Sequence, residues 1–77
     1  MSKEIPTAVL DEARNLISHY GQHIEFLGEF CGAEYYTFRF PENSLTGFPY
    51  VYIYDLQTED VLEITGFNAL DIINKFR

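Results

Sequence analysis

Cysteine is almost absent from this sequence, since Cys31 is the only one among 77 residues. A single cysteine cannot form a disulfide within the chain, whereas a secreted domain this small commonly needs two or more bridges to supplement its core. The first six residues also lack the apolar stretch of a signal peptide, and no apolar run approaches the roughly 20 residues that span a bilayer. We therefore expect a cytoplasmic protein with no membrane partner.

Basic residues are also scarce, with five Lys and Arg against twelve Asp and Glu, which gives a net charge of −7. Between Phe40 and Asn74 there is no Lys or Arg at all. A negative field repels phosphate backbones and attracts cationic partners. The composition therefore disfavours nucleic-acid binding and predicts a negative surface on the second half of the chain.

The sequence lacks a nucleophile with a base placed beside it. Cys31 has apolar and acidic neighbours, a setting that disfavours the reactive thiolate. His19 and His23 are four residues apart but straddle Gly21, where a helix is expected to end, so they do not share a helical face. We interpret both histidines as ordinary residues of a helix end and a strand surface.

Cofactor, metal and nucleotide motifs are missing as well. The stretch that holds Asp55, Gln57, Glu59 and Asp60 lacks the central glycine and distal glutamate of a calcium loop, so we interpret it as a hairpin turn opened by Asp55. The sequence contains no GxGxxG, GxxxxGK[ST], GxSxG or HExxH pattern. We therefore predict no enzyme activity, no cofactor and no metal site.

Large apolar side chains are plentiful, with 47% hydrophobic residues that include seven Phe and six Tyr. Each such ring buries roughly 150–250 Å² in a core. A chain of this length still has room for only one core. We predict a single domain over residues 1–77.

The spacing of apolar residues predicts a helix at each end of the chain. Within residues 6–20 the apolar positions recur every three or four residues, and Pro6 and Gly21 suit the first turn and the end of a helix. The same spacing returns after Gly66, with Thr65 as the expected cap.

Between the helices the sequence predicts four strands, at residues 23–30, 35–40, 50–54 and 61–64. Cys31 and Gly32 suit a tight turn between the first two strands. Consecutive strands with short connections usually pair as antiparallel neighbours. The predicted fold class is α+β: a two-layer sandwich in which the N- and C-terminal helices cover one face of a four-stranded antiparallel sheet, in the order α-β-β-β-β-α.

The alternation within each strand also assigns side chains to two faces. A bulge at Gly28 would invert the parity of one strand end. We expect one buried cluster to contain Leu16, Phe26, Phe38, Ile53 and Ile73. The more apolar face, which we expect to meet the helices, consists of Ile24, Phe26, Phe30, Tyr36, Phe38, Phe40, Val51, Ile53, Leu62 and Ile64.

The opposite face, predicted to remain open, is rich in tyrosine. Tyrosine and arginine are enriched at interface hot spots, although β-propensity alone also places tyrosine in strands. The candidate interaction residues, predicted to form one continuous surface, are Tyr35, Arg39, Tyr50, Tyr52 and Tyr54.

The leading hypothesis is a small acidic protein-interaction module whose open sheet face docks a protein partner or a second copy of the chain. One alternative is a ligand- or peptide-binding domain in which the loop at residues 41–49 closes over the ligand. That loop is also the predicted most mobile internal segment. Another alternative is an acidic inhibitor whose carboxylates mimic nucleic acid.

Overall fold

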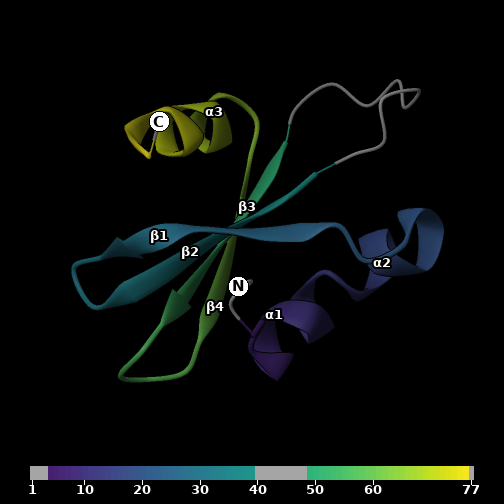
Figure 1. The fold of residues 1–77 in the computed structure, drawn as a ribbon, viewed down its shortest axis with the longest axis horizontal. Helices are drawn as coiled ribbons and strands as arrows, with labels where there is room; N and C mark the ends of the chain where they lie inside the picture. Colours follow the sequence, from purple (N-terminus) through teal and green to yellow (C-terminus); the bar gives the residue numbers. More distant parts are fainter. Residues whose placement is uncertain (1–3, 40–48, 77) are drawn as a thin grey trace.

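A four-stranded antiparallel sheet forms the centre of the computed structural model, which describes residues 4–39 and 49–76 (Figure 1). The strands lie side by side in sequence order, β1-β2-β3-β4. The elements are α1 (Thr7–Glu12), α2 (Arg14–Tyr20), β1 (Ile24–Phe30), β2 (Ala33–Phe38), β3 (Tyr50–Asp55), β4 (Val61–Thr65) and α3 (Phe67–Lys75). The α+β class and the antiparallel sheet are confirmed, with two helices before the sheet and one after it.

The predicted N-terminal helix is bent at Ala13, whose φ of −91° and ψ of 10° leave the helical range. The Ala13 N–H still donates to the Val9 carbonyl at 3.0 Å, and the Ile17 N–H donates to the Ala13 carbonyl at 2.9 Å. Gly21, with a φ of 89°, ends α2 as predicted. The bend allows α1 to lie across the sheet while α2 lies toward the end at which β1 begins (Figure 1).

Both predicted turns are confirmed. Cys31 and Gly32 have φ values of 52° and 76°, the two positive angles that a type I′ turn requires. In the β3–β4 turn the Asp55 Oδ1 atom accepts hydrogen bonds from the backbone N–H groups of Gln57 and Thr58, at 2.8 and 3.1 Å. That carboxylate therefore closes the turn.

A bulge interrupts β1 next to Gly28, where the sequence left the parity of the strand open. The register between β1 and β2 shifts between Phe26 and Gly28, which leaves Leu27 as the extra residue. Beyond the bulge Phe30 lies opposite Ala33, and its side chain points to the other face from that of Phe26. The bulge therefore removes Phe30 from the face to which alternation assigned it.

Helices cover both faces of the sheet, so the predicted arrangement on one face is wrong. Figure 1 shows α1 and α3 on opposite sides of the strands. One apolar cluster joins α1 to the sheet and consists of Val9, Ala13, Ile24, Tyr36, Phe38 and Tyr52, with Leu16 packed against it. The other joins α3 to the sheet and consists of Val51, Ala69 and Ile73, with Leu27, Tyr35, Ile53, Ile64 and Ile72 packed against it. The molecule has three layers, helix on sheet on helix.

The prediction placed the wrong side of β3 on the face of Tyr36 and Phe38. Tyr36 lies opposite Tyr52 and not opposite Val51 or Ile53, so the tyrosine side of β3 shares a face with Tyr36 and Phe38. A shift of one residue in register moves every side chain of a strand to the other face. Because tyrosine rings bury at least as much apolar surface as Val or Ile, both sides of β3 qualify as core.

The single predicted cluster is consequently divided. Phe38 and Leu16 belong to the cluster under α1, whereas Ile53 and Ile73 belong to the cluster under α3. Phe26 belongs to neither cluster and is 39% exposed on the edge strand. Of the residues assigned to the apolar face, those that lie on the α3 side are Phe30, Val51, Ile53, Leu62 and Ile64, and Phe40 lies outside the described residues.

The C-terminal helix packs on the bulge. Gly66, with a φ of 74°, takes the cap position predicted for Thr65. The ring centroid of Phe76 lies 5.2 Å from that of Tyr35, and a Cβ atom on Gly28 would lie only 2.7 Å from the Phe76 ring. Glycine at the bulge therefore makes room for Phe76. None of the helices in the described segments is long and apolar enough to cross a membrane.

We expect Phe38→Ala to unfold most of the protein at room temperature. Phe38 is 1% exposed, and its ring contacts those of Tyr20 and His23. Truncation of a buried Phe costs about 3–5 kcal/mol, against a total stability of about 5 kcal/mol for a small domain. Urea unfolding monitored by circular dichroism measures the effect. Phe30→Ala is the matched control because Phe30 is 63% exposed, and equal midpoints for the two variants would contradict the assignment of faces.

Candidate functional site

The five predicted interaction residues are divided between the two faces of the sheet. Tyr50, Tyr52 and Tyr54 lie on the α1 side, and Tyr35 lies on the α3 side. Arg39 follows β2, and its Nη1 atom pairs at 2.7 Å with Glu25, which lies opposite Thr37 in the register and therefore also on the α3 side. The prediction of one continuous open surface is wrong, because Tyr52 is opposite Tyr36 and α1 covers that face.

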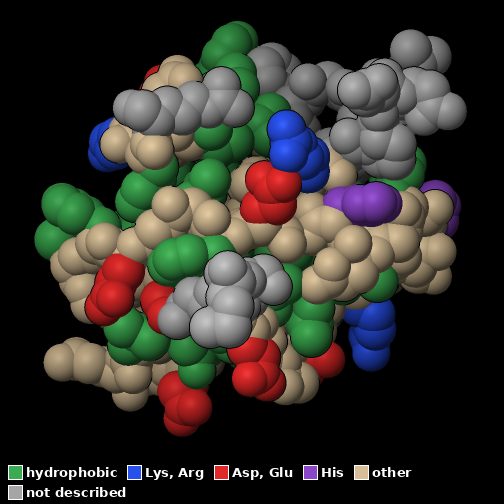
Figure 2. Space-filling view, viewed as in Figure 1, with side chains coloured by type: hydrophobic (Ala, Val, Ile, Leu, Met, Phe, Trp, Pro, Cys, Tyr) green, Lys and Arg blue, Asp and Glu red, His purple; other side chains and the backbone are tan. Residues whose placement is uncertain are grey.

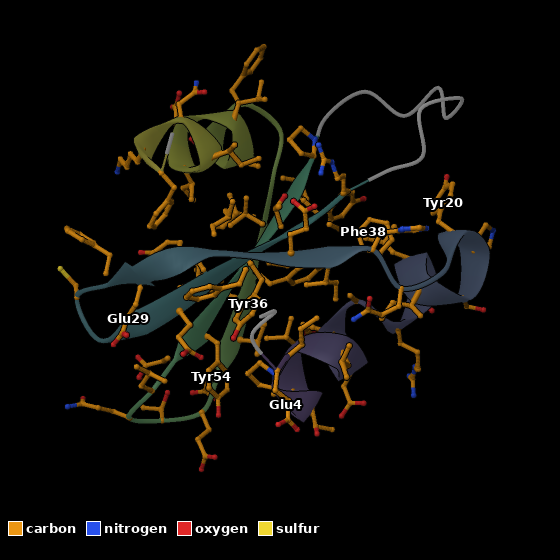
Figure 3. The ribbon with its side chains drawn as sticks, in the orientation of Figure 1. Glu4, Tyr20, Glu29, Tyr36, Phe38 and Tyr54 are labelled. Carbon is orange, nitrogen blue, oxygen red and sulfur yellow. The ribbon has the colours of Figure 1, made fainter. Side chains whose placement is uncertain are left out.

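On the α1 side, three tyrosine hydroxyls each donate a hydrogen bond to a glutamate. The Tyr36 hydroxyl lies 3.1 Å from Glu34 Oε1, the Tyr52 hydroxyl 2.9 Å from Glu63 Oε2, and the Tyr54 hydroxyl 3.4 Å from Glu59 Oε1. Figure 3 shows Tyr36 and Tyr54 below β1, on the side of the sheet that faces α1. We call these six residues the Tyr–Glu patch: Glu34, Tyr36, Tyr52, Tyr54, Glu59 and Glu63.

The strand register brings the members of the patch together. Tyr36, Tyr52 and Glu63 lie opposite one another across β2, β3 and β4. Glu34 and Tyr54 form the next row toward the β3–β4 turn, which supplies Glu59. Glu34 of β2 and Glu63 of β4 lie on the same face, separated by β3, and adjacent strands are about 4.8 Å apart.

The tyrosine rings are held below the surface, and two of the carboxylates reach solvent. Tyr36 and Tyr52 are fully buried, Tyr54 is half-buried, and Glu59 and Glu63 are exposed. Glu34 is only 7% exposed and accepts the Tyr36 hydrogen bond. The buried rings of Tyr36 and Tyr52 therefore orient Glu34 and Glu63, and the half-buried Tyr54 donates to Glu59.

The pKa of each patch tyrosine is raised above the ordinary value of 10.0. For Tyr36 and Tyr52 the main cause is burial, followed by the hydrogen bond to the partner glutamate and the charge of that glutamate. For Tyr54 burial also comes first, followed by the charge of Glu59. All three tyrosines therefore remain neutral hydrogen-bond donors at neutral pH.

The α1 side of the sheet is acidic. Neither α1 nor β2, β3 or β4 contains a Lys or Arg, and α1 adds Asp11 and Glu12. The Glu12 charge is one of those that raise the Tyr52 pKa. In the part of the chain that the structure describes, Glu59 and Glu63 form no ion pair. Figure 2 shows acidic side chains interspersed with apolar ones over the region below β1.

Two glutamates on this side lie directly opposite each other. Glu29 of β1 pairs with Glu34 of β2 in the register, and Cβ atoms in such positions are about 4.5–5.5 Å apart. Like charges in this arrangement destabilise a sheet. We therefore expect the pair to raise the negative potential beside the patch and to lower the folding stability.

The other candidates that the sequence raised take ordinary positions. Cys31 is exposed in the β1–β2 turn, and the His23 ring packs edge-on against Phe38 at 6.1 Å between centroids. Among the described residues, no group of three or more His, Cys, Asp and Glu side chains is arranged to hold a metal ion. The proposed ligand loop at residues 41–49 lies outside the described residues, except for Pro49.

Sequence reasoning missed four of the six patch residues, namely Glu34, Tyr36, Glu59 and Glu63. Glu34 and Tyr36 are two residues apart and so share a face within β2, but nothing in the sequence states that Tyr36 pairs with Tyr52. Glu59 belongs to a turn and follows no strand period. The available signal was the alternation of Glu and Tyr in β2 together with tyrosine at every second position of β3.

Comparison of the chain with protein-family models, with curated proteins and with solved structures finds no match. What the protein binds is therefore inferred from its own side chains. The patch offers carboxylate acceptors and aromatic rings, which are the groups that bind ammonium and guanidinium ions.

Because their pKa values are raised in the folded state, the patch tyrosines should make the protein sensitive to alkali. The neutral tyrosines contribute fully to the free energy of unfolding below the unfolded pKa of about 10. This contribution is lost as the pH rises toward the folded pKa. For the buried Tyr36 and Tyr52, each ring that ionises only in the unfolded state contributes a loss of about 1.4 kcal/mol per pH unit in that range. Urea unfolding between about pH 8 and pH 11 should show a shallower loss for Tyr52→Phe than for the parent. An identical slope would contradict the raised Tyr52 pKa.

Glu29→Lys should stabilise the protein, because it replaces repulsion from Glu34 with attraction. The expected gain is about 0.2–1 kcal/mol, and it should shrink at high salt because screening weakens charges near the surface. Glu25→Lys is the matched control on the same strand, and it should lower the stability because it breaks the ion pair with Arg39. A urea midpoint for Glu29→Lys at or below that of the parent would contradict the repulsion.

Proposed function

We propose that this protein is a small interaction module that binds a cationic partner protein, rich in Lys or Arg, through the Tyr–Glu patch. The observation that carries the proposal is the set of three tyrosine-held glutamates on a face where neither the covering helix nor β2, β3 or β4 supplies a Lys or Arg. Such a face attracts positive charge, and the overall charge of −7 reinforces the attraction.

The exposed carboxylates retain the capacity to bind a partner. A carboxylate offers about four acceptor positions, and the tyrosine hydroxyl occupies one of them in Glu59 and in Glu63. The remaining positions can accept charge-assisted hydrogen bonds from ammonium or guanidinium groups. The half-buried Tyr54 adds an aromatic ring that can form a cation–π contact.

Preorganisation favours this binding. Fixing a flexible glutamate in a complex costs conformational entropy, and a side chain that is already held loses less on binding. The ring of Tyr52 is fully buried, and its hydroxyl donates to Glu63 Oε2 at 2.9 Å. The patch therefore presents oriented charge, and long-range attraction raises the association rate at low salt. We place this interaction in the cytoplasm, which the exposed free thiol of Cys31 supports.

Calorimetric titration with oligolysine tests the proposal. The double variant Glu59→Gln and Glu63→Gln keeps the side-chain shape and an oxygen that accepts the tyrosine bonds, but it removes two charges. Since an exposed ion pair contributes about 0.2–1 kcal/mol, we expect affinity to fall about fivefold. Binding should also weaken as salt is added.

The matched control for net charge is the double variant Glu25→Gln and Asp71→Asn. It removes the same number of charges, from the edge of the α3 side and from α3 itself. We expect its affinity for oligolysine to stay close to that of the parent. Equal losses in the two double variants would show that only the net charge matters and would contradict a role for the patch.

A further inference from the structure

We infer that the cationic partner binds as an extended strand added to the outer edge of β4, with a Lys or Arg opposite Glu63. This inference rests on the proposed function, since Glu63 belongs to the Tyr–Glu patch. It adds the conformation of the partner and the pattern of its side chains. Main-chain hydrogen bonds to a free sheet edge supply affinity in such complexes, and alternate side chains supply specificity.

Within the described part of the chain, the backbone groups on the outer edge of β4 pair with no other strand, and their positions follow from the register. β4 is the last strand of the sheet, and the described residues contain no strand beyond it. The Asp55 N–H donates to the Asp60 carbonyl at 2.9 Å, and hydrogen-bonded pairs alternate along an antiparallel ladder. The backbone N–H and C=O groups of Leu62 and Ile64 therefore point toward β3. The residues whose N–H and C=O groups point to the outer edge are Val61, Glu63 and Thr65.

The other edge of the sheet is less suited to an added strand. β1 carries the bulge at Leu27, which breaks the regular spacing of backbone groups and twists the edge. β4 pairs with β3 over five consecutive positions with no shift in register, and it contains no Pro or Lys. A bulge, a Pro and a Lys each protect a strand edge from pairing, and β4 has none of these three.

Side chains on the two faces of β4 define the sequence pattern of the partner. Glu63 is exposed on the α1 side, where it lies opposite Tyr52. Leu62 is 58% exposed on the α3 side, opposite Ile53. A strand laid against this edge places alternate side chains beside a carboxylate and beside an apolar surface. The matching segment alternates Lys or Arg with an apolar residue.

A second copy of the chain fits this edge poorly. Antiparallel pairing of two β4 strands about their centres would place Glu63 opposite Glu63 of the copy, and like charges directly opposite are destabilising. The two chains would also each carry a charge of −7. Charge complementarity therefore selects a cationic segment as the occupant.

Amide exchange of the parent protein with a peptide of alternating Lys and Val tests the mode of binding. On saturation we expect new protection at the amides of Val61, Glu63 and Thr65, because these donors point to the edge. The neighbouring amides of Leu62 and Ile64, which already donate to β3, should change little. Binding without protection at the three edge amides would overturn strand addition and leave the proposed function standing.

A pair of N-methylated peptides supplies the matched control. Methylation of the backbone nitrogens on one edge of the peptide keeps every charge but removes the donors that would face β4, and affinity should fall about tenfold through two or more lost hydrogen bonds. Methylation on the opposite edge should leave affinity unchanged. Because the peptide lies against β4 by one edge only, equal effects of the two methylations would overturn the inference.

Two further outcomes separate this inference from the proposal on which it rests. Failure of the Lys-Val peptide and of oligolysine to bind the parent would overturn the proposed function together with the inference. Protection of the three edge amides in the parent without any peptide, with a dimer by sedimentation, would assign the edge to a second copy and overturn the inference alone.

Discussion

The pairing of Tyr36 with Tyr52 is the contact on which the rest of the structure depends. It decides which side of β3 meets α1, and with that it decides the composition of both apolar clusters. It places Val51 and Ile53 beneath α3 and the tyrosines of β3 beneath α1. The same pairing brings the hydroxyls of Tyr52 and Tyr54 beside glutamates of β4 and of the β3–β4 turn.

Coverage of both faces limits where a partner can bind. A small chain buries a modest share of its surface, and here that share is distributed over two helix-to-sheet interfaces. The large apolar side chains that remain exposed include Phe26, Phe30 and Leu62, which all belong to the two edge strands. What remains accessible of the sheet is therefore its edges and the margin of the face beneath α1.

The acidic side chains of that margin are clustered in a way that does not favour folding stability. We expect the register pairing of Glu29 with Glu34 to lower stability, whereas the tyrosine hydroxyls that donate to Glu34, Glu59 and Glu63 raise it. Proteins accept such costs where a binding surface requires them, which fits the proposal that this face binds a cationic partner.

The sequence by itself determined the local structure. Gly21 ends a helix, Cys31 and Gly32 form the turn, and Asp55 closes the next turn, because each depends on residues near it in the chain. The tertiary structure alone decided which strand faces share a core, and hence which tyrosines meet which glutamates. Alternation fixes the two sides of each strand separately, whereas register between strands depends on packing across the sheet. Both sides of β3 are apolar, with tyrosine rings on one and Val51 and Ile53 on the other. Which side faces α1 is therefore decided only by the helices packed on each face.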